Sequence, residues 1–185
     1  MPDNSNLASK LALRRYFLDK YHSKDSILVL DCCCGSRVIW DNLSQDYRVI
    51  EYLPLDVKRD TKSIHMDSVR FIRDLAWHHN IVDVDTYGSP WKHWLALIRK
   101  IHRPTSVFLT VFGHVCIGVD RSSLTESLGL APLKVPIAIL LKLAPMAINA
   151  LLFSASKYCT LTEVAEIESG NANIRYLGVH LLPQK

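Results

Sequence analysis

Short apolar runs alternate with helix-like segments along most of the sequence, and this alternation constrains the fold more than any other feature. Runs of β-branched and aromatic residues bounded by turn-forming residues predict strands, whereas apolar residues three and four positions apart predict helices. Strands joined through helices pair in parallel, which favours an α/β fold with helices on both faces of the sheet. The strands predicted in this way are Ile27–Asp31, Tyr47–Asp56, Ser63–Met66, the first part of Ile81–Pro90 and Thr105–Phe112, and the helices are Leu7–His22, Arg37–Leu43, Val69–Trp77 and Trp91–His102.

The C-terminal part of the chain predicts an antiparallel edge. Tyr158–Glu168 and Asn173–Leu182 are two further strand candidates, and the Ser169–Asn171 turn between them suits a hairpin. With the strands named above, they predict a mostly parallel seven-stranded sheet with an antiparallel C-terminal hairpin. A chain of 185 residues has the length of one domain, so we expect a single domain over 1–185 with an N-terminal helix and lead-in over 1–25.

Composition narrows the class of protein. Hydrophobic residues make up 49% of the chain and charged residues 22%, which is typical of a globular protein. The net charge of +4 and the pI of about 8.8 make the chain mildly basic. That balance suits an anionic substrate, and ordinary surface lysines explain it equally well.

The cysteine pattern argues against both a disulfide framework and a zinc site. Cys32, Cys33 and Cys34 are adjacent, Cys116 and Cys159 stand alone, and no Cys-x-x-Cys pair occurs. The histidines lack the His-x-x-x-His spacing of a metal site, so we expect no bound metal. Free cysteines, together with an N-terminus that lacks the apolar core of a signal peptide, favour a reducing, cytoplasmic location.

One apolar segment, Val135–Ala155, is long enough to raise the question of a membrane span. Lys142 lies near its middle, and Pro136 and Pro145 interrupt it, which disfavours a spanning helix. We therefore expect no membrane insertion, and one or two buried helices that cover the sheet. A membrane-associated helix and a surface that faces substrate or a second subunit are the alternatives.

The stretch Ile81–Pro90 places two carboxylates in or at the end of an apolar strand. Carboxylates are rarely buried without a partner, so Asp83 and Asp85 indicate a site rather than a packing choice. Tyr87 follows Asp85 by two positions, and ligands of open α/β sheets bind at the carboxyl ends of the strands. The alternative is a buried strand that an ordinary turn closes.

A second candidate site begins where Ile27–Asp31 ends. A turn of small residues, Cys32–Ser36, follows the strand and leads into a helix, which is the order of a nucleotide-binding unit. Gly35 lets the backbone approach a ligand closely, but Cys33 replaces a second glycine, so the Gly-x-Gly-x-x-Gly fingerprint is absent. The acidic end of the strand also suits a ligand with a positive group better than a pyrophosphate.

Acidic residues further along the chain follow this turn at the sequence spacing expected of ribose-binding acids. Asp56 comes 21 positions after Gly35, close to the spacing at which an acid binds ribose hydroxyls, although turns favour aspartate for their own reasons. Glu51 is the second choice for this role. Asp67 and Ser68 are predicted to cap the next helix, and this cap could also face the adenine of a bound nucleoside.

The landmarks resemble a class I S-adenosylmethionine-dependent methyltransferase, which has a Rossmann-like sheet. The turn Asp31–Arg37 resembles the family's Asp-x-Gly-x-Gly-x-Gly motif and departs from it at Cys33 and Arg37. The stretch Asp83–Pro90 resembles the Asp-x-Asp-Pro-Tyr-Gly-Ser-Pro motif of the Trm1 family of tRNA guanine N2-methyltransferases. Here Thr86 replaces the proline, whose carbonyl orientation helps to hold an amino group in that family.

The resemblance implies S-adenosylmethionine as the cofactor and an exocyclic amino group of a nucleic-acid base, in tRNA or DNA, as the methyl acceptor. A small-molecule or protein substrate stays open, as does a non-catalytic interaction module that keeps the fold. We expect a protein partner or a homodimer as a further option, because the chain lacks the extra C-terminal domain of the tRNA enzymes. Lys10, Arg14 and Arg15 on the first helix could meet phosphate, with a solvated helix face as the alternative. The resulting site residues are Asp85 and Tyr87 for catalysis; Asp31, Cys33, Gly35, Arg37, Asp56, Asp67, Ser68 and Asp83 for the cofactor; and Thr86, Gly88, Ser89, Pro90, Arg14 and Arg15 for the substrate.

Overall fold

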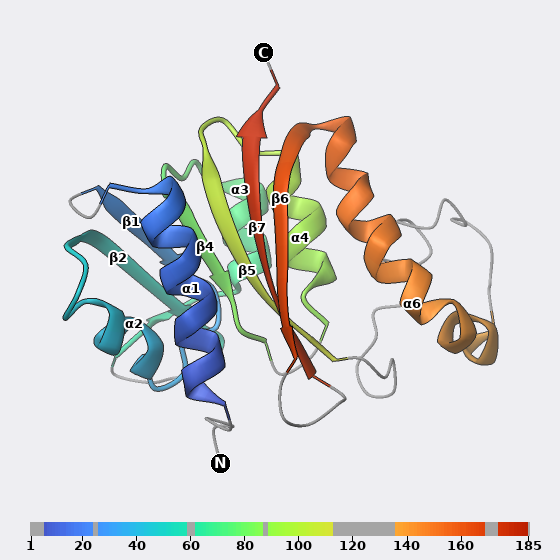
Figure 1. Cartoon of the computed structure of the whole chain (residues 1–185), viewed down its shortest axis with the longest axis horizontal. Coiled ribbons are helices and arrows are strands. Elements are labelled where there is room, and N and C mark those ends of the chain that lie inside the picture. The colour runs from blue at the N-terminus through green and yellow to red at the C-terminus, as the bar shows by residue number, and fades with distance from the viewer. Residues whose placement is uncertain are drawn as a thin grey trace.

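The structure is a computed structural model that describes residues 6–23, 26–58, 62–86, 89–112, 136–168 and 174–184. Its strands are β1 (Ile27–Asp31), β2 (Val49–Asp56), β3 (Ile64–His65), β4 (Ile81–Val84), β5 (Thr105–Phe112), β6 (Cys159–Glu168) and β7 (Ile174–Pro183). They form one seven-stranded sheet in the order β3-β2-β1-β4-β5-β7-β6 (Figure 1). The first five strands pair in parallel, and β7 is antiparallel to both β5 and β6, which confirms the predicted sheet. The predicted hairpin turn lies outside the described residues.

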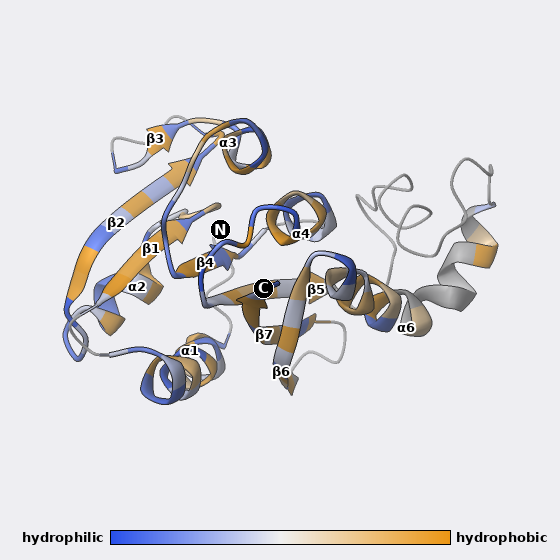
Figure 2. Ribbon diagram, turned by 90° about the horizontal axis from the view of Figure 1, so that it is seen from above, coloured by the Kyte–Doolittle hydropathy of each residue, from blue (hydrophilic) through white to orange (hydrophobic). Residues whose placement is uncertain are grey.

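Helices cover both faces of this sheet, as predicted. α1 (Leu7–Tyr21) and α2 (Val38–Leu43) lie on one face, and α3 (Ser68–Asp74) and α4 (Trp91–Ile98) lie on the other (Figures 1 and 2). α6 (Ile137–Ser154) and the short helix η1 (Ala155–Lys157) lead into β6. Consecutive strand residues therefore enter opposite cores: Val29 packs with α1 and α2, and Leu30 packs with α3 and α4.

Parallel pairing sets two acids side by side in the middle of the sheet. All four residues of β4 are buried, as is usual for a parallel strand covered on both faces. In the register of β1 and β4, Asp31 lies opposite Asp83. Two neighbouring carboxylates in a buried sheet require a nearby cation, because isolated buried charges are strongly disfavoured.

Arg14 on α1 supplies that cation. Its Nε and Nη2 donate to the two carboxylate oxygens of Asp83 at 2.7 and 2.6 Å, and both side chains are only 2% exposed. Its Nη1 donates to the carbonyl oxygen of Lys10 at 3.0 Å, while Trp40 Nε1 on α2 donates to Asp83 at 2.8 Å. The ion pair therefore ties both helices of this face to β4.

A pair of histidines holds the other end of α1. His22 Nε2 hydrogen-bonds with Ser106 Oγ at 2.8 Å, and the same hydroxyl hydrogen-bonds with His180 Nδ1 at 3.0 Å. Tyr21 stacks on His180, with 3.8 Å between the ring centroids. Burial, together with the charges of His180 and Arg103, lowers the pKa of His22 to about 4. The folded state thus favours a neutral His22.

The position of α6 differs in part from the prediction of one or two buried helices over Val135–Ala155. The apolar segment forms one helix of 18 residues, and its C-terminal end is buried where Trp94 Nε1 donates to the Leu151 carbonyl oxygen at 2.6 Å. Among the α6 side chains that the structure describes, Ile139, Met146 and Phe153 are exposed, so the prediction of a buried helix is wrong at these positions. α6 runs obliquely away from the edge strand β6 (Figure 1), so it does not cover the sheet along its whole length. No helix in the described part of the chain is long and apolar enough to cross a membrane.

We expect Arg14→Met to lower the free energy of unfolding by about 3–5 kcal/mol, because Asp83 would stay buried without its cation. Urea unfolding measures the loss. Arg15→Met is the matched control: Arg15 pairs with Asp46 at 2.8 Å, but these side chains are 42% and 52% exposed. Such a pair contributes about 1 kcal/mol or less. Equal losses in the two variants would show that the buried pair does not hold α1.

Stability should also fall as the pH is lowered from about 6.5 to about 4. In this window the unfolded chain protonates His22 and the folded chain does not, so unfolding takes up a proton. His22→Gln keeps a hydrogen-bonding group beside Ser106 and should flatten the dependence of the melting temperature on pH. Burial lowers the pKa of His180 as well, so part of the slope should remain. A slope identical to that of the wild type would contradict the assignment to His22.

Candidate functional site

The carboxyl ends of β1, β2 and β4 bring together most of the residues predicted for a cofactor site. Cys33 lies among them: its thiol hydrogen-bonds with Ser68, and the carboxylates of Asp31, Asp56 and Asp85 are near enough to act on it. Burial, followed by these three negative charges, raises the pKa of Cys33. The site is therefore acidic, and its thiol is held in the protonated form.

The turn after β1 leaves room for a ligand at Gly35. Gly35 has a φ of +48°, which side chains rarely adopt, and a Cβ built there would meet nothing within 4 Å. Its N–H donates to Asp56 Oδ2 at 3.2 Å, and the N–H of Lys58 donates to Asp56 Oδ1 at 2.8 Å. The predicted ribose-binding acid thus faces the glycine turn across the open side of the site.

Arg37 occupies a backbone conformation that suits glycine. Its φ is +62°, and it stands at the position of the last glycine in the motif, just before α2. Its guanidinium lies 4.6 Å from the ring centroid of Tyr52, and the Tyr52 hydroxyl donates to Asp31 Oδ2 at 2.7 Å. The departure from the motif therefore keeps the glycine-like turn and places a cation over the ring of Tyr52, whose hydroxyl binds Asp31.

Asp31 is a buried carboxylate whose charge is incompletely balanced. Burial raises its pKa well above the usual range, and the neighbouring charge of Asp83 raises it further. The Tyr52 hydrogen bond and the charge of Arg14 act in the opposite direction. A cationic ligand beside Asp31 would stabilise its ionised form, because an opposite charge favours the charged state.

Asp85 is held from two sides at the end of β4. Lys10 Nζ on α1 lies 2.6 Å from Asp85 Oδ2, and Thr110 Oγ1 on β5 donates to Asp85 Oδ1 at 2.5 Å. The Asp85 side chain is 21% exposed, so it faces the site while its partners fix its orientation. A carboxylate has about four lone-pair sites, so acceptor capacity remains for a further donor.

Lys10 was expected to meet phosphate but pairs with Asp85, and Thr110 is a site residue that the sequence analysis did not include. Lys10 comes four positions before Arg14, so helical periodicity places both cations on the same face of α1. That spacing explains why both residues meet acids of β4. Nothing in the sequence marks Thr110, because its contact with Asp85 depends on how β5 lies beside β4.

Two predicted roles need correction. Arg14 was expected to meet substrate and Asp83 to meet the cofactor, but each is buried and each satisfies the other. Their role is structural in this fold. Arg15 pairs with Asp46 at the surface rather than with the acids of the site.

The structure describes most of the other residues predicted for the site. Asp67 caps α3, with its Oδ1 accepting from the N–H groups of Val69 and Arg70 at 2.9 and 3.1 Å, which confirms the predicted cap. Ser68 Oγ hydrogen-bonds with the buried His93 Nε2 at 2.8 Å. Pro90 precedes the first residue of α4, and Ser89 Oγ accepts a long hydrogen bond of 3.4 Å from the N–H of Trp91. The neighbouring Thr86 is described, whereas Tyr87 and Gly88 lie outside the described residues.

The cysteines beside this site are free. Cys32 and Cys34 are buried and Cys33 is partly buried, and Cys159 lies in another part of the fold. Cys116 is outside the described residues. Across the ranges that the structure describes, no group of three or more His, Cys, Asp or Glu side chains is placed to hold a metal ion.

No protein-family profile and no curated protein matches the sequence, but solved structures match its fold. Trm1 from Pyrococcus horikoshii, solved with S-adenosyl-L-methionine, has a TM-score of 0.64 and 14% identity, over 97% of this chain and 56% of that one. N-methyltransferase NodS from Bradyrhizobium japonicum WM9, in complex with S-adenosyl-L-homocysteine, has a TM-score of 0.56 and 11% identity, over 99% and 90% of the two chains. The 1,6-didemethyltoxoflavin-N1-methyltransferase from Burkholderia thailandensis, with S-adenosylhomocysteine bound, has a TM-score of 0.54 and 12% identity, over 99% and 80%.

These likenesses concern the fold, because the identities are low. The chain spans little more than half the length of Trm1 and most of the length of the other two enzymes. It therefore shares the fold of S-adenosylmethionine-dependent methyltransferases.

The strained turn at Arg37 can be tested directly. Arg37→Gly and Arg37→Ala both remove the contact with Tyr52, but only glycine adopts a positive φ without cost. We expect the glycine variant to be more stable than the alanine variant by about 1 kcal/mol. Chemical unfolding of the two proteins measures the difference. Equal stabilities would show that this position does not need a left-handed backbone.

Proposed function

We propose that this protein is an S-adenosylmethionine-dependent methyltransferase that acts on an exocyclic amino group of a nucleic-acid base, in RNA such as tRNA or in DNA. The observation that carries the proposal is the placement of Asp85. Lys10 and Thr110 hold this carboxylate at the end of β4, beside the acidic turn of Cys33. A carboxylate acceptor that its neighbours hold in one orientation, and that stays partly exposed, suits the binding of an amino group.

The residues of the turn fit the cofactor's chemical groups. Asp56 faces the turn as an acceptor for ribose hydroxyls, and Gly35 keeps the space beside it open. Asp31 lacks a full counter-charge, which favours the positively charged methionyl part of the cofactor. Asp67 and Ser68, at the start of α3, remain the proposed contacts for adenine. When bound, the cofactor supplies a methyl group attached to a positively charged sulfur.

The protein's own contribution would be positioning and exclusion of water. The amino group of the base would donate a hydrogen bond to Asp85, which turns its lone pair away from the carboxylate and toward the methyl group. Lys10 and Thr110 each hold one oxygen of Asp85, which fixes the direction in which the carboxylate accepts a hydrogen bond. The sequence motif assigns Tyr87 to stacking on the base, a contact of about 1–3 kcal/mol. A base in a duplex would first have to leave the stack.

One contact also favours a second candidate, a non-catalytic binding module. Lys10 already satisfies Asp85 at 2.6 Å, so this carboxylate has a structural partner even without a substrate. Arg37 and Thr86 are the motif positions at which such a module would have departed from an active enzyme. Cofactor binding without methyl transfer to any acceptor would identify this second function.

Asp85→Asn separates the two candidates. It keeps the shape of the side chain and replaces an acceptor with a donor, so we expect a loss of about 10²–10⁴ in the rate of methyl transfer. Label transfer from S-adenosylmethionine to bulk tRNA, DNA and cell extract measures the rate. The affinity for S-adenosylhomocysteine, measured by calorimetry, should stay nearly unchanged.

Asp46→Asn is the control, because Asp46 is also an ion-paired aspartate but lies at the surface beside Arg15. It should keep both the transfer rate and the cofactor affinity of the wild type. A wild-type protein that does not bind S-adenosylhomocysteine would overturn the whole proposal. A protein that binds it and labels only a small molecule or protein would overturn the nucleic-acid substrate alone.

A further inference from the structure

α6 carries a line of exposed apolar side chains. Ile139 is 48% exposed, Met146 62% and Phe153 77%. They are seven positions apart, which is close to two helical turns, so they form one stripe along the same face of the helix. Single exposed apolar residues are normal on a protein surface, but a stripe along the length of a helix marks an interaction surface.

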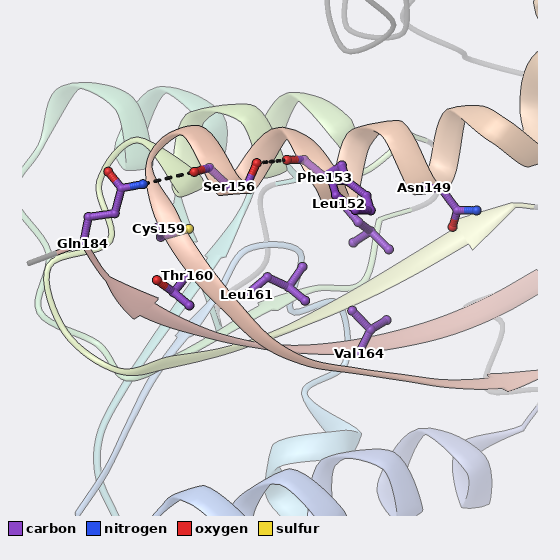
Figure 3. A pocket seen from close by; sticks show the side chains of 9 residues that line it. All are labelled: Asn149, Leu152, Phe153, Ser156, Cys159, Thr160, Leu161, Val164 and Gln184. Atoms are coloured by element: carbon purple, nitrogen blue, oxygen red, sulfur yellow. Dashed lines mark hydrogen bonds between the residues drawn. The ribbon is translucent and has the colours of Figure 1, made fainter.

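The stripe ends at a pocket between α6 and β6. The pocket has a volume of about 470 Å³ and includes Phe153 in its wall. Figure 3 shows apolar side chains from α6 and β6 at its centre, with Gln184 Nε2 donating to the Ser156 carbonyl oxygen at 3.0 Å toward one end. The residues that line it are Asn149, Leu152, Phe153, Ser156, Cys159, Thr160, Leu161, Val164 and Gln184.

This surface is separate from the candidate active site. β6 is the last strand at its edge of the sheet, and β7, β5 and β4 lie between it and β1. The acids of the candidate site lie at the ends of β1, β2 and β4. The pocket and the stripe therefore have no role in the proposed methyl transfer, and another function must account for them.

We propose that this surface binds the same surface of a second copy of the chain, with the two α6 helices antiparallel across a two-fold axis at Met146. Ile139 and Phe153 are each seven positions from Met146. An axis at Met146 therefore places Ile139 against Phe153 of the second copy, and Phe153 against Ile139 of the second copy. A two-fold interface requires this kind of self-complementary patch. At each of its ends, the smaller Ile139 side chain of one copy meets the larger Phe153 side chain of the other.

The pocket fits the same arrangement. In the antiparallel register, Pro136 of the second copy lies opposite Ser156, at the pocket end of the stripe. The N-terminal end of the second α6 thus reaches the apolar opening that Phe153 and Val164 border. One copy contributes the pocket and the other contributes the helix end, and the two-fold axis repeats this contact.

Charge favours a second copy over a charged partner. Lys142 is the one ionisable residue within α6, and the helix contains no acid. A nucleic acid or a highly charged protein would find little to pair with on such a surface. In the antiparallel pair the two Lys142 positions are eight residues apart along the axis, or about 12 Å. That separation exceeds the screening length of about 8 Å at physiological salt, so their repulsion is weak.

The size of the surface sets the strength of the association. A helix of 18 residues is about 27 Å long, so one helix pair with its two pockets forms a small interface. Interfaces at the small end of the range are weak or transient. We therefore expect a monomer–dimer equilibrium that depends on concentration in the micromolar range.

Sedimentation velocity of the whole chain over a micromolar concentration series measures this equilibrium. Met146→Glu sets two like charges on the axis and should leave only monomer. Ile50→Glu is the matched control, because Ile50 is 59% exposed and lies on β2, near the opposite edge of the sheet. It should dimerise like the wild type. A wild type that stays monomeric at every concentration overturns the proposal, as does equal dissociation by both variants.

Oxidative crosslinking tests the register. Met146→Cys places the new thiols of two copies together at the axis and should give a covalent dimer. Ile139→Cys should not, because in this register the two positions lie fourteen residues apart along the axis, or about 21 Å. The wild type, oxidised in parallel, gives the background from its own cysteines. Crosslinking of both variants would indicate parallel helices, and monomers that instead sediment with lipid vesicles would assign the surface to a membrane; either result overturns the antiparallel dimer.

Discussion

The ion pair between Arg14 and Asp83 is the interaction on which the rest of the structure depends. Parallel pairing of β1 and β4 sets Asp31 beside Asp83 in the middle of a sheet that is covered on both faces. Without a cation, two adjacent buried carboxylates would oppose folding. Arg14 binds both oxygens of Asp83, and Trp40 adds a hydrogen bond from α2. The helices of this face are therefore part of the electrostatic balance of the sheet.

The same helix connects stability with function. Lys10 lies one turn before Arg14, so the ion pair that docks α1 also brings Lys10 to Asp85. The backbone carbonyl oxygen of Lys10 accepts a hydrogen bond from Arg14 Nη1 within α1. Loosening α1 would thus disturb both the buried ion pair and the candidate catalytic carboxylate. The two aspartates of β4 have different tasks, since Asp83 faces the helix layer and Asp85 faces the site.

The distribution of charge at the candidate site would favour a cationic ligand. Arg14 neutralises Asp83 and Lys10 neutralises Asp85, but Asp31 has only a tyrosine hydrogen bond and more distant cations. Burial, and then the neighbouring charge of Asp83, raise the pKa of Asp31. A ligand with a sulfonium and an ammonium group would supply the missing charge, whereas a pyrophosphate would add to the repulsion. The absence of the dinucleotide glycine fingerprint points in the same direction.

The sequence by itself determined the elements and their order. β1 and β5 begin and end where the apolar runs predicted, and α1 and α4 follow the helical spacing of their apolar residues. The same local signals placed Asp31, Gly35, Asp56 and Asp85 at strand ends, where a ligand site was expected. Such features depend on residues close together in the chain, so periodicity and turn chemistry are enough to find them.

Only the tertiary structure decided which charges meet. Arg14 and Asp83 are 69 positions apart, and Lys10 and Asp85 are 75 apart, so no local pattern links them. Whether an arginine on a helix faces water or a buried acid depends on how the helix docks. The exposure of α6 is a second case, because its apolar sequence resembles that of a buried helix. Which of its apolar side chains stay exposed depends on packing between distant segments rather than on the helix's own residues.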